Sequence, residues 1–502
     1  MKFFRKLRQD RAIRREREAA IRAKLLDAYK TIGDVEGWKL DAQQMECITK
    51  EARSHLVIAG AGTGKTTTIV GKIKYMLRKG TLRPENILVL SFTNASAKEM
   101  RERIAKETDE RIEASTFHKL GLNIIKSVHG RAGMPGISEI DMEEFIKARI
   151  PEADEGTRKL VETIINLMKN NDWDIERTRK VLLQNDASVG ILERVEPTLE
   201  DYQNELAKND EIDFNDMINL ATKYVREGKY LHEYKCVIVD EYQDISKSRF
   251  GLLKAMRDVR DYDLFAVGDD WQSIYRFAGS DIGFILEFEK YWGESEISKI
   301  ETTYRSPQKL IDIAGSFIME NPNQVKKAIK SPHKTYDFPL MEICAVNDLK
   351  LQKFLIEELM ELPEHSTVYF IGRYNFDIRL IKRNRSFEVD GEEVSFLGRP
   401  DLDIRFITAH RSKGLQADYV FIINNKEEAA AGFPSQIPDD PILGLLLENS
   451  DDFEFAEERR LFYVACTRAK KRVFLLTTKE KESVFVKELR RKYGGKMKRV
   501  LY

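Results

Sequence analysis

The stretch HLVIAGAGTGKT, from His55 to Thr66, joins a continuous apolar run to a glycine-rich loop and leads directly into a sequence of helical spacing. A strand, a glycine loop and a helix in this order bind phosphate, because glycine lets the backbone approach the anion and direct its N–H groups at it. In the general pattern Lys65 reaches the β- and γ-phosphates and the Thr66 hydroxyl binds magnesium. The predicted phosphate-contacting residues are Ala59, Gly60, Ala61, Gly62, Thr63, Gly64, Lys65 and Thr66.

A second apolar run ends in two adjacent carboxylates. Residues 236–244 read CVIVDEYQD, so Asp240 and Glu241 follow directly after a predicted buried strand. At the end of a strand Asp240 can hold magnesium through water, and Glu241 can orient and deprotonate an attacking water molecule. Acidic residues after an apolar strand are common on their own. Together with the phosphate loop, they predict hydrolysis of a nucleoside triphosphate rather than binding alone.

Short apolar runs alternate with helical stretches along the rest of the chain. Continuous, β-branched runs bounded by turns are typical of strands buried on both faces of a parallel sheet. The runs form two sets, 55–59, 86–91, 236–240 and 264–268, then 367–372, 404–408, 419–423 and 472–476. Two sets predict two α/β sheets. Residues 119–205 have helical spacing and almost no strand signal, so we expect a helical insertion in the first sheet domain.

The composition limits the class of protein. Of 502 residues, 42% are hydrophobic, which is enough to build cores and excludes a wholly disordered chain. Lys+Arg and Asp+Glu number 83 each, which excludes a bulk polycation but not a local basic patch. The four cysteines form no C-x-x-C pair, and no run approaches the roughly 20 apolar residues of a membrane span. We therefore expect a cytoplasmic protein without membrane contact.

Residues 1–36 have the spacing of a basic helix. Residues 1–30 hold eleven Lys/Arg against four Asp/Glu. A solvated helix packed on a neighbour is the simpler interpretation of this segment. A contact with nucleic acid or another acidic partner is the alternative.

The order of motifs resembles that of superfamily 1 DNA helicases of the UvrD/Rep/PcrA type, from about Leu40 to Lys470. LDAQQ (40–44) resembles the Q motif, AGAGTGKT is that family's own form of the phosphate loop, and VDEYQD resembles motif II. Motifs Ia, Ib, III, IV, V and VI follow in order as SFTNASAKEM (91–100), STFHKL (115–120), VGDDWQSIYRFAGSD (267–281), TTYRSP (302–307), ITAHRSKGLQADYVFI (407–422) and EERRLFYVACTRAKK (457–471). The resemblance implies two tandem RecA-like P-loop domains, ATP and Mg²⁺ as cofactors, and DNA as partner.

Carried over by position, the resemblance implies a role for each nucleotide-site residue. It places Gln44 on the adenine base, Tyr304 stacked on that base, and Gln272 as a sensor of the γ-phosphate. Arg305 and Arg468 are far away in sequence, and the resemblance implies that both reach the γ-phosphate from the second sheet domain. The implied catalytic residues are Lys65, Asp240, Glu241, Gln272, Arg305 and Arg468, and the implied metal ligands are Thr66 and Asp240.

Two nucleotide-binding positions depart from the family pattern. The residue after the loop threonine is often Arg, flanking adenine opposite the tyrosine, whereas this chain has Thr67. The departure predicts that a side chain stacks on only one face of the base. Motif V usually has Glu where this chain has Gln416, which we expect near the ribose.

Motifs Ia, Ib, III and V of the family face single-stranded DNA. Aromatic side chains stack on bases without reading sequence, at ~1–3 kcal/mol each, whereas hydroxyl, amide and basic groups hold phosphates. The resemblance implies DNA contacts at Phe92, Thr93, Asn94, Phe117, His118, Tyr275, Arg276, Phe277 and His410. Phe277-Ala278 replaces the Trp-Arg of the best-known members, so one DNA-contacting arginine is absent.

The motifs also set the expected domain limits. UvrD-type enzymes carry an accessory 2B domain between motifs IVa and V, where this chain has only 375–402, so we expect that domain to be missing or a remnant. The motif III variant and the stretch 433–441 look most similar to the helicase IV subgroup. The expected segments are a basic helical extension at 1–36, a first RecA-like domain at 37–118 and 206–296, a helical insertion at 119–205, and a second RecA-like domain at 297–374 and 403–502.

These motifs favour an ATP-dependent DNA helicase and single-stranded DNA translocase that acts on tailed or forked duplex. The 3′-to-5′ polarity follows from the resemblance alone. A motor that remodels protein–nucleic acid complexes with little unwinding is the first alternative, because the accessory domain is lost. A nucleotide-switched interaction protein is the second. A helicase–nuclease is disfavoured, since only about thirty residues follow motif VI.

Overall fold

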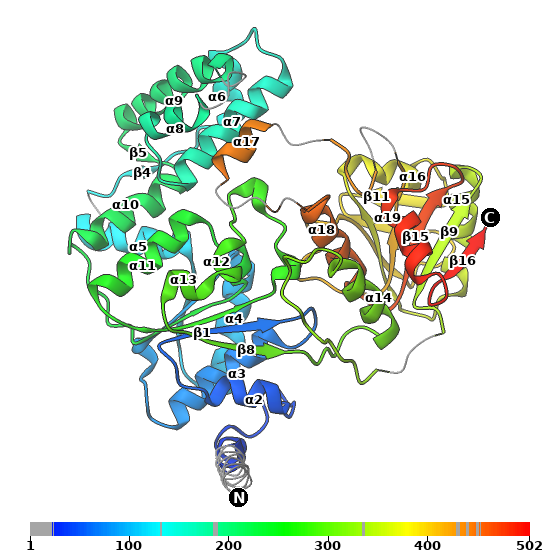
Figure 1. Cartoon of the computed structure of the whole chain (residues 1–502), viewed down its shortest axis with the longest axis horizontal. Coiled ribbons are helices and arrows are strands. Elements are labelled where there is room, and N and C mark those ends of the chain that lie inside the picture. Colours follow the sequence, from blue (N-terminus) through cyan, green and yellow to red (C-terminus); the bar gives the residue numbers. More distant parts are fainter. Residues whose placement is uncertain are drawn as a thin grey trace, which may run out of the picture.

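The computed structural model describes residue 23 and residues 25–502, apart from 131–132, 184–188, 334–336, 428–431, 438–440, 448–450 and 452. Two sheet domains and a helical lobe make up this part of the chain (Figure 1). The basic extension predicted at 1–36 lies mostly outside the described residues. Its last part, residues 25–32, is helical and buries Ala28 and Ile32 against the first sheet domain.

The first sheet has six strands in the order β3-β2-β6-β7-β1-β8, and all of them pair in parallel. The strands are β1 (Ser54–Ala59), β2 (Ile87–Ser91), β3 (Glu113–Thr116), β6 (Cys236–Val239), β7 (Asp263–Gly268) and β8 (Glu296–Ile300). In a parallel sheet the carboxyl ends of all strands lie at one edge. The glycine loop after β1 and the carboxylates after β6 therefore meet at the same edge.

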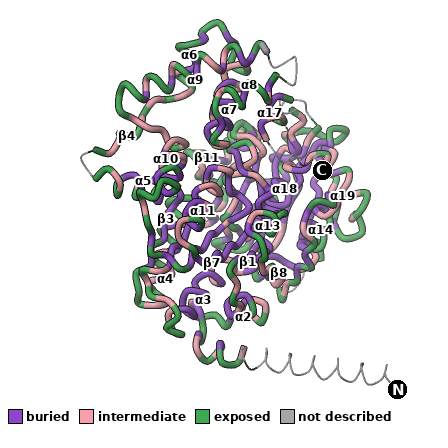
Figure 2. Tube along the Cα trace, turned by 60° about the vertical axis from the view of Figure 1, so that its left-hand side comes forward, coloured by how far each residue is buried: buried purple, intermediate pink, exposed green. Residues whose placement is uncertain are grey.

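Helices cover both faces of the first sheet, which explains why its strands are continuous apolar runs. Val57 and Ile238 point into one core, whereas Leu56 and Val237 point into the other. Figure 2 shows the buried residues concentrated along these strands. One face carries α2 (Ala42–Thr49), α3 (Lys65–Arg78) and α4 (Asn94–Thr108), and the other carries α5 (Phe117–His129), α10 (Phe214–Arg226), α11 (Lys247–Val259), α12 (Gly283–Leu286) and α13 (Phe288–Trp292).

The second sheet has eight strands in the order β11-β12-β13-β10-β14-β15-β9-β16. Pairing is parallel from β13 to β16, whereas β12 is antiparallel to both of its neighbours. The strands are β9 (Leu340–Ala345), β10 (Thr367–Gly372), β11 (Phe387–Asp390), β12 (Glu393–Phe396), β13 (Asp403–Thr408), β14 (Ala417–Ile422), β15 (Ala469–Thr478) and β16 (Lys498–Leu501). Helices α14 (Gln308–Ile318), α18 (Ala456–Cys466) and α19 (Val484–Tyr493) pack on one face, and α15 (Asp348–Glu361) on the other. The predicted fold class with two α/β sheet domains is confirmed, with one sheet parallel throughout and the second parallel except at β11 and β12.

The helical lobe is smaller than the insertion predicted at 119–205. Helix α5 packs Leu120 and Ile124 into the core of the first sheet domain, so that domain continues past residue 119. The predicted limit at 296 likewise falls inside β8. The lobe consists of α6 (Met142–Arg149), α7 (Glu155–Asn170), α8 (Ile175–Leu182) and α9 (Val189–Asn209), with the short strands β4 (Gly136–Ile137) and β5 (Glu211–Ile212) at its base.

A short helix from the second sheet domain completes the core of this lobe. Helix α17 (Pro441–Leu446) lies beside α7 and α8, far in sequence from both (Figure 1). Ile442 and Leu446 are buried in the lobe core, and Asn171 Nδ2 donates to the Leu446 carbonyl at 2.9 Å. The lobe is therefore anchored to both sheet domains.

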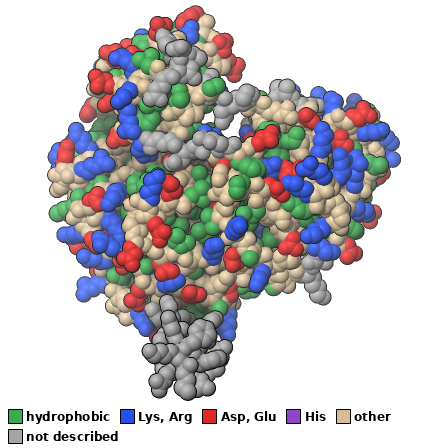
Figure 3. All heavy atoms as spheres, in the orientation of Figure 1, with side chains coloured by type: hydrophobic (Ala, Val, Ile, Leu, Met, Phe, Trp, Pro, Cys, Tyr) green, Lys and Arg blue, Asp and Glu red, His purple; other side chains and the backbone are tan. Residues whose placement is uncertain are grey.

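The segment expected to be a remnant of the accessory domain joins the second sheet. Residues 375–402 form α16 (Arg379–Lys382) and the β11–β12 hairpin, which pairs with β13. Figure 3 shows Lys and Arg side chains gathered over the part of the second domain that carries α15, α16 and α19. Among the helices that the structure describes, none has the length and apolar character needed to cross a bilayer.

Candidate active site between the sheet domains

The phosphate loop adopts left-handed turns that its glycines permit. Gly62 and Gly64 have φ of 73° and 80°, a region that favours glycine. The Thr63 hydroxyl donates to the Gly60 carbonyl at 2.9 Å and closes the turn. Helix α3 begins at Lys65, directly after Gly64, so the free N–H groups of its first turn face the loop. Thr66 is half-buried in that first turn.

The two carboxylates after β6 face the loop lysine. Lys65 Nζ lies 3.5 Å from Glu241 Oε2, and Gln243 Nε2 donates to the same oxygen at 2.6 Å. Burial raises the pKa of Asp240 to about 7, and the charge of Glu241 adds to this effect. Burial also opposes ionisation of Glu241, but Lys65 and Lys413 outweigh it and lower the Glu241 pKa to about 2. Glu241 is therefore charged at neutral pH, whereas Asp240 exchanges its proton in that range.

The segment after β8 crosses to the second domain over the phosphate loop. Thr303 Oγ1 donates to the Ala61 carbonyl at 2.7 Å, and Tyr304 N donates to the Gly62 carbonyl at 2.9 Å. A Cβ on Gly62 would lie 2.6 Å from Arg305 Cβ, so only glycine allows this approach. The structure thus places Arg305 directly against the loop.

Arg468 approaches the same place from the second domain. It is fully buried, and its Nη2 donates to Gln272 Oε1 at 3.3 Å. Burial and, to a smaller extent, the nearby charge of Arg305 lower the pKa of Arg468 to about 9. The buried Arg468 thus repels both Arg305 and Lys65, which are half-buried beside it. A polyphosphate anion fits these cations, because it would relieve the repulsion.

Helix α2 and Tyr304 border the loop on the side expected to receive the base. Gln44 Nε2 donates to the Thr63 carbonyl at 3.2 Å. Tyr304 is 47% exposed, and its hydroxyl donates to Asp41 Oδ2, the cap of α2, at 3.0 Å. An exposed aromatic ring beside an amide that can hydrogen-bond a base edge suits a nucleobase.

The connection between β13 and β14 adds groups from the second domain. Gln416 Oε1 accepts a hydrogen bond from Arg305 Nε at 3.2 Å. Lys413 forms an ion pair with the buried Asp244 carboxylate and donates to the Gln272 carbonyl at 2.8 Å. Neither Lys413 nor Asp244 was singled out as a site residue from the sequence. The signal was available, since both lie within matched motifs.

A row of aromatic rings runs from the first domain to the second. Phe92 stacks on Tyr275 with centroids 6.3 Å apart and planes 10° apart, and Phe277 packs edge-on against His410 at 5.3 Å. Tyr275 lies 6.1 Å from Phe277 and 6.4 Å from His410, so the rings are continuous. Phe277 is 60% exposed and open to a base. Arg249, which the sequence analysis missed, lies 4.1 Å from the Phe92 ring centroid.

The other predicted DNA contacts differ in placement. Thr93 and Asn94 are exposed at the N-terminus of α4. Burial lowers the pKa of His118 and of His410 to about 4, so both rings are neutral at pH 7 and suited to stacking rather than to pairing with phosphate. Phe117 is buried in the core of the first domain, which corrects the prediction of a surface contact there.

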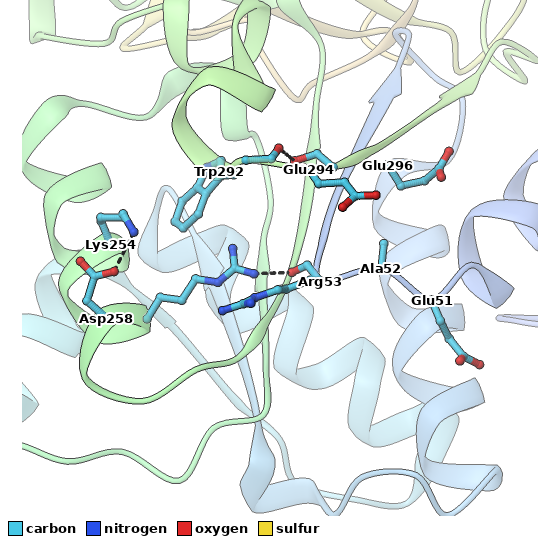
Figure 4. A pocket seen from close by; sticks show the side chains of 11 residues that line it. Glu51, Ala52, Arg53, Lys254, Asp258, Trp292, Glu294 and Glu296 are labelled. Carbon is cyan, nitrogen blue, oxygen red and sulfur yellow. Dashed lines mark hydrogen bonds and ion pairs between the residues drawn. The ribbon is translucent and has the colours of Figure 1, made fainter.

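A polar hollow at the opposite edge of the first sheet is separate from this cleft. It lies before β1 and beside β8, and its lining includes Arg53 and Trp292 (Figure 4). Arg257 donates to the Arg53 carbonyl at 2.8 Å, and Lys254 pairs with Asp258 at 2.6 Å. Its cations are paired within the protein, so the features suited to nucleotide binding converge at the loop instead.

The sequence matches two families of domains and several named proteins. Residues 40–292 match the family described as UvrD/REP helicase N-terminal domain, and residues 384–480 match the UvrD-like helicase C-terminal domain. DNA helicase IV of Escherichia coli K12 is 31% identical over 94% of this chain and 73% of its own length. The probable DNA helicase II homologue of Mycoplasma capricolum is 28% identical over 70% of this chain and 52% of its own length. The ATP-dependent DNA helicase PcrA of Staphylococcus aureus is 28% identical over 66% of this chain and 46% of its own length.

Proposed function

Because the chain belongs to the UvrD/REP helicase family and is thereby an ATP-dependent DNA helicase, we propose that it moves 3′-to-5′ along single-stranded DNA and unwinds tailed or forked duplex. The observation that carries the proposal is the cleft, where Arg468 from the second sheet domain lies within electrostatic range of Lys65 and Glu241 of the first. A nucleotide bound there contacts both domains, so its hydrolysis changes how strongly they hold together. The direction of movement is taken from the family resemblance.

In this proposal hydrolysis uses residues of both domains. Lys65 and the loop N–H groups bind the β- and γ-phosphates, and Glu241 accepts the proton of the attacking water. Arg305 and Arg468 stabilise the negative charge that develops on the γ-phosphate. Gln272, hydrogen-bonded to Arg468, connects that guanidinium to the first domain. Release of the γ-phosphate removes the anion that holds these cations together, so hydrolysis favours an open cleft.

Thr66 and Asp240 are the proposed magnesium ligands. Hydroxyl and carboxylate oxygens are the protein ligands that this ion prefers. The raised pKa of Asp240 indicates a buried carboxylate whose charge is incompletely compensated, and a cation fits such a group. When bound, magnesium neutralises phosphate charge.

The aromatic row is the proposed path of the DNA strand. Phe92, Tyr275 and Phe277 offer rings that stack on any base, as a motor moving over arbitrary sequence requires. Because the row crosses from the first domain to the second, a change in domain spacing changes the stacking contacts between the rings and the DNA strand. The four cysteines are all buried and outside disulfides, which supports action in the reducing cytoplasm.

Two assays test the proposal. ATP hydrolysis should rise when a single-stranded oligonucleotide is added. A fluorescent duplex with a 3′ tail should then release its labelled strand in the presence of ATP, whereas the same duplex with a 5′ tail should not. Preferential release from the 5′-tailed duplex would overturn the polarity, and hydrolysis indifferent to DNA would overturn the motor.

One observation favours a second candidate function, the remodelling of protein–nucleic acid complexes with little unwinding. Residues 375–402 form a short helix and a hairpin that complete the second sheet, where a UvrD-type enzyme has a whole accessory domain. DNA-stimulated ATP hydrolysis without strand release, combined with displacement of a protein bound to the oligonucleotide, would favour this second function.

A further inference from the structure

A half-buried polar cluster adjoins the nucleotide cleft beside the first turn of α3. Arg103, on α4, forms a two-pronged ion pair with Glu36, with Nε–Oε1 at 2.5 Å and Nη2–Oε2 at 2.7 Å. Arg103 Nη2 also donates to the Thr67 hydroxyl at 3.1 Å, and that hydroxyl donates to Glu36 Oε2 at 3.0 Å. Thr67 directly follows the loop residue Thr66, so the cluster is fixed to the nucleotide site by covalent neighbours.

The cluster lies next to the amide expected to meet the base. A Cβ on Gly64 would be 2.7 Å from Gln44 Nε2 and 3.9 Å from Thr67 Cβ, so both side chains lie against this one glycine. Tyr304 reaches the start of the helix that carries Gln44, because its hydroxyl donates to the cap residue Asp41. Arg103 also lies within electrostatic range of Asp240, which places its charge at the cleft.

The way Arg103 is held decides what it can bind. Its in-plane donors are directed at Glu36, Thr67 and, through Nη1 at 3.0 Å, Glu99. Two carboxylates thus contact one guanidinium, so the local net charge is negative and does not favour binding of a phosphate. The side chain is nevertheless 25% exposed. A guanidinium bound along its edges presents its flat face, and a flat cation stacks on aromatic rings.

We propose that Arg103 forms a wall of the base subsite and stacks its guanidinium face on the adenine ring, and that Tyr304 provides a second stacking contact to the same ring. Glu36 and Thr67 are positioning residues in this proposal, because they fix the plane of the guanidinium. The one-sided stacking expected from Thr67 is thereby replaced by a cation that α4 supplies through space. The inference rests on the proposed function, since it assumes that a nucleotide occupies the loop.

The test measures equilibrium binding of two probes, Mg-ADP and Mg-tripolyphosphate, by titration calorimetry on the full chain. Tripolyphosphate reports the phosphate loop alone, because it has no base. Arg103→Lys keeps the charge and removes the flat face, so ADP affinity should fall roughly three- to thirtyfold, the range of a cation–π contact, while tripolyphosphate affinity stays unchanged. Arg101→Lys is the matched control on the same helix, since Arg101 contacts the Ala114 carbonyl instead, and it should bind both probes like the parent.

Either of two results overturns the inference. Unchanged ADP affinity in Arg103→Lys shows that no stacking contact was lost, and parallel loss of both probes shows that Arg103 supports the loop instead of the base. Glu36→Gln keeps Arg103 but removes the charged partner that fixes the plane of its guanidinium. It should lower the affinity for ADP, by a smaller factor than Arg103→Lys, and leave the affinity for tripolyphosphate unchanged. This variant provides the test if Arg103→Lys does not fold. Neither titration involves hydrolysis or DNA, so failure of the proposed motor function would be detected separately, in the DNA-stimulated ATPase assay.

Discussion

Lys65 is the residue through which the phosphate loop contacts the rest of the cleft. Its ammonium faces Glu241 at 3.5 Å and feels the charges of Asp269 and Asp240 as well. Removal of this ammonium leaves these carboxylates facing the nucleotide with less positive charge to balance them. Substitutions at this position and its neighbours therefore test the cleft most directly.

Lys65→Ala removes the cation that binds the β- and γ-phosphates. We expect ATP hydrolysis to fall at least ~100-fold, as for loss of a principal electrostatic contact in an active site. Binding of single-stranded DNA should be unchanged, since the aromatic row is separate from the loop. Steady-state ATPase and fluorescence anisotropy measure the two quantities. Retained turnover would contradict the phosphate-site assignment.

Gly62→Ala tests the contact between the loop and the crossing segment. The new Cβ would lie 2.6 Å from Arg305 Cβ and 2.7 Å from Thr303 Oγ1, so that segment must move. Gly80→Ala is the matched control, because Gly80 shares the left-handed backbone but has nothing within 4 Å of an added Cβ. Both variants carry about 1–2 kcal/mol of backbone strain, but only Gly62→Ala should abolish ATP hydrolysis. Equal activity in the two variants would count against the contact.

Proton and magnesium compete for Asp240 in the proposed site. Burial raises the Asp240 pKa to about 7, so the carboxyl is increasingly protonated below that pH. The magnesium concentration needed for half-maximal ATPase should therefore fall as pH rises from 6 to 8 and level off above. Titrating magnesium at saturating ATP and fixed ionic strength measures this. A requirement that does not change with pH would remove Asp240 from the proposed metal site.

At the scale of elements, most central strands could be predicted and the edge strands could not. β9 is a central strand that was missed although it is buried throughout, because Glu342 interrupts its apolar run. The eight apolar runs all lie in strands, because helices cover both faces there. β3 and β8, which the sequence analysis missed, are the two edges of the first sheet, and β8 mixes two isoleucines with charged and polar residues. β16, another missed strand, is an edge of the second sheet. An edge strand has one open side and does not need a continuous apolar run.

The residues of the candidate site likewise include some that could be predicted from sequence and some that could not. Lys65 and Asp240 could be placed together from sequence, because both follow strands whose carboxyl ends share an edge. Arg103 and Arg249 could not, since each lies on a helix, Arg249 in its first turn, and only packing brings it to the ATP site or to the aromatic row. Phe117 was assigned to DNA by its motif, yet the helix it begins turns the ring into the core.

Because helix α17 completes the core of the helical lobe, we expect a substitution on α17 to lower the stability of the lobe. Leu446 is fully buried between α7 and α8, so Leu446→Ala should destabilise the lobe by about 2–5 kcal/mol. Gly444→Ala is the control on the same helix, because an added Cβ there has nothing within 4 Å. Hydrogen exchange of α7 and α8 should accelerate only in the first variant. Unchanged protection would show that α17 does not stabilise the lobe.

At the scale of the whole molecule, the two sheet domains touch through the crossing segment, through Arg468 and Gln272, and through the ion pair of Lys413 with Asp244. The last pair is buried and also lies under Tyr275, whose ring centroid is 4.9 Å from Lys413 Nζ. It therefore connects motif II, motif V and the proposed DNA path. An ion pair in that place can carry the effect of DNA binding to the ATP site.

Lys413→Met should uncouple these activities. It leaves Asp244 buried without its cation, which costs several kcal/mol unless the carboxyl takes up a proton. We expect ATP hydrolysis without DNA to persist and its stimulation by single-stranded DNA to be largely lost. Lys426→Met, which removes the ion pair with Asp348 on the same domain, is the control and should keep full stimulation. Normal stimulation in Lys413→Met would exclude this route.

The buried cysteines have a practical consequence for following the cleft as it opens. Thiols react as thiolates, and burial raises the pKa of Cys47 and of Cys236 to about 12 and the pKa of Cys466 beyond that. Cys344 is buried as well. Surface cysteines introduced in pairs, one on each sheet domain, would therefore be the readily labelled thiols of an otherwise natural chain. Dyes attached to them would report the separation of the domains during turnover.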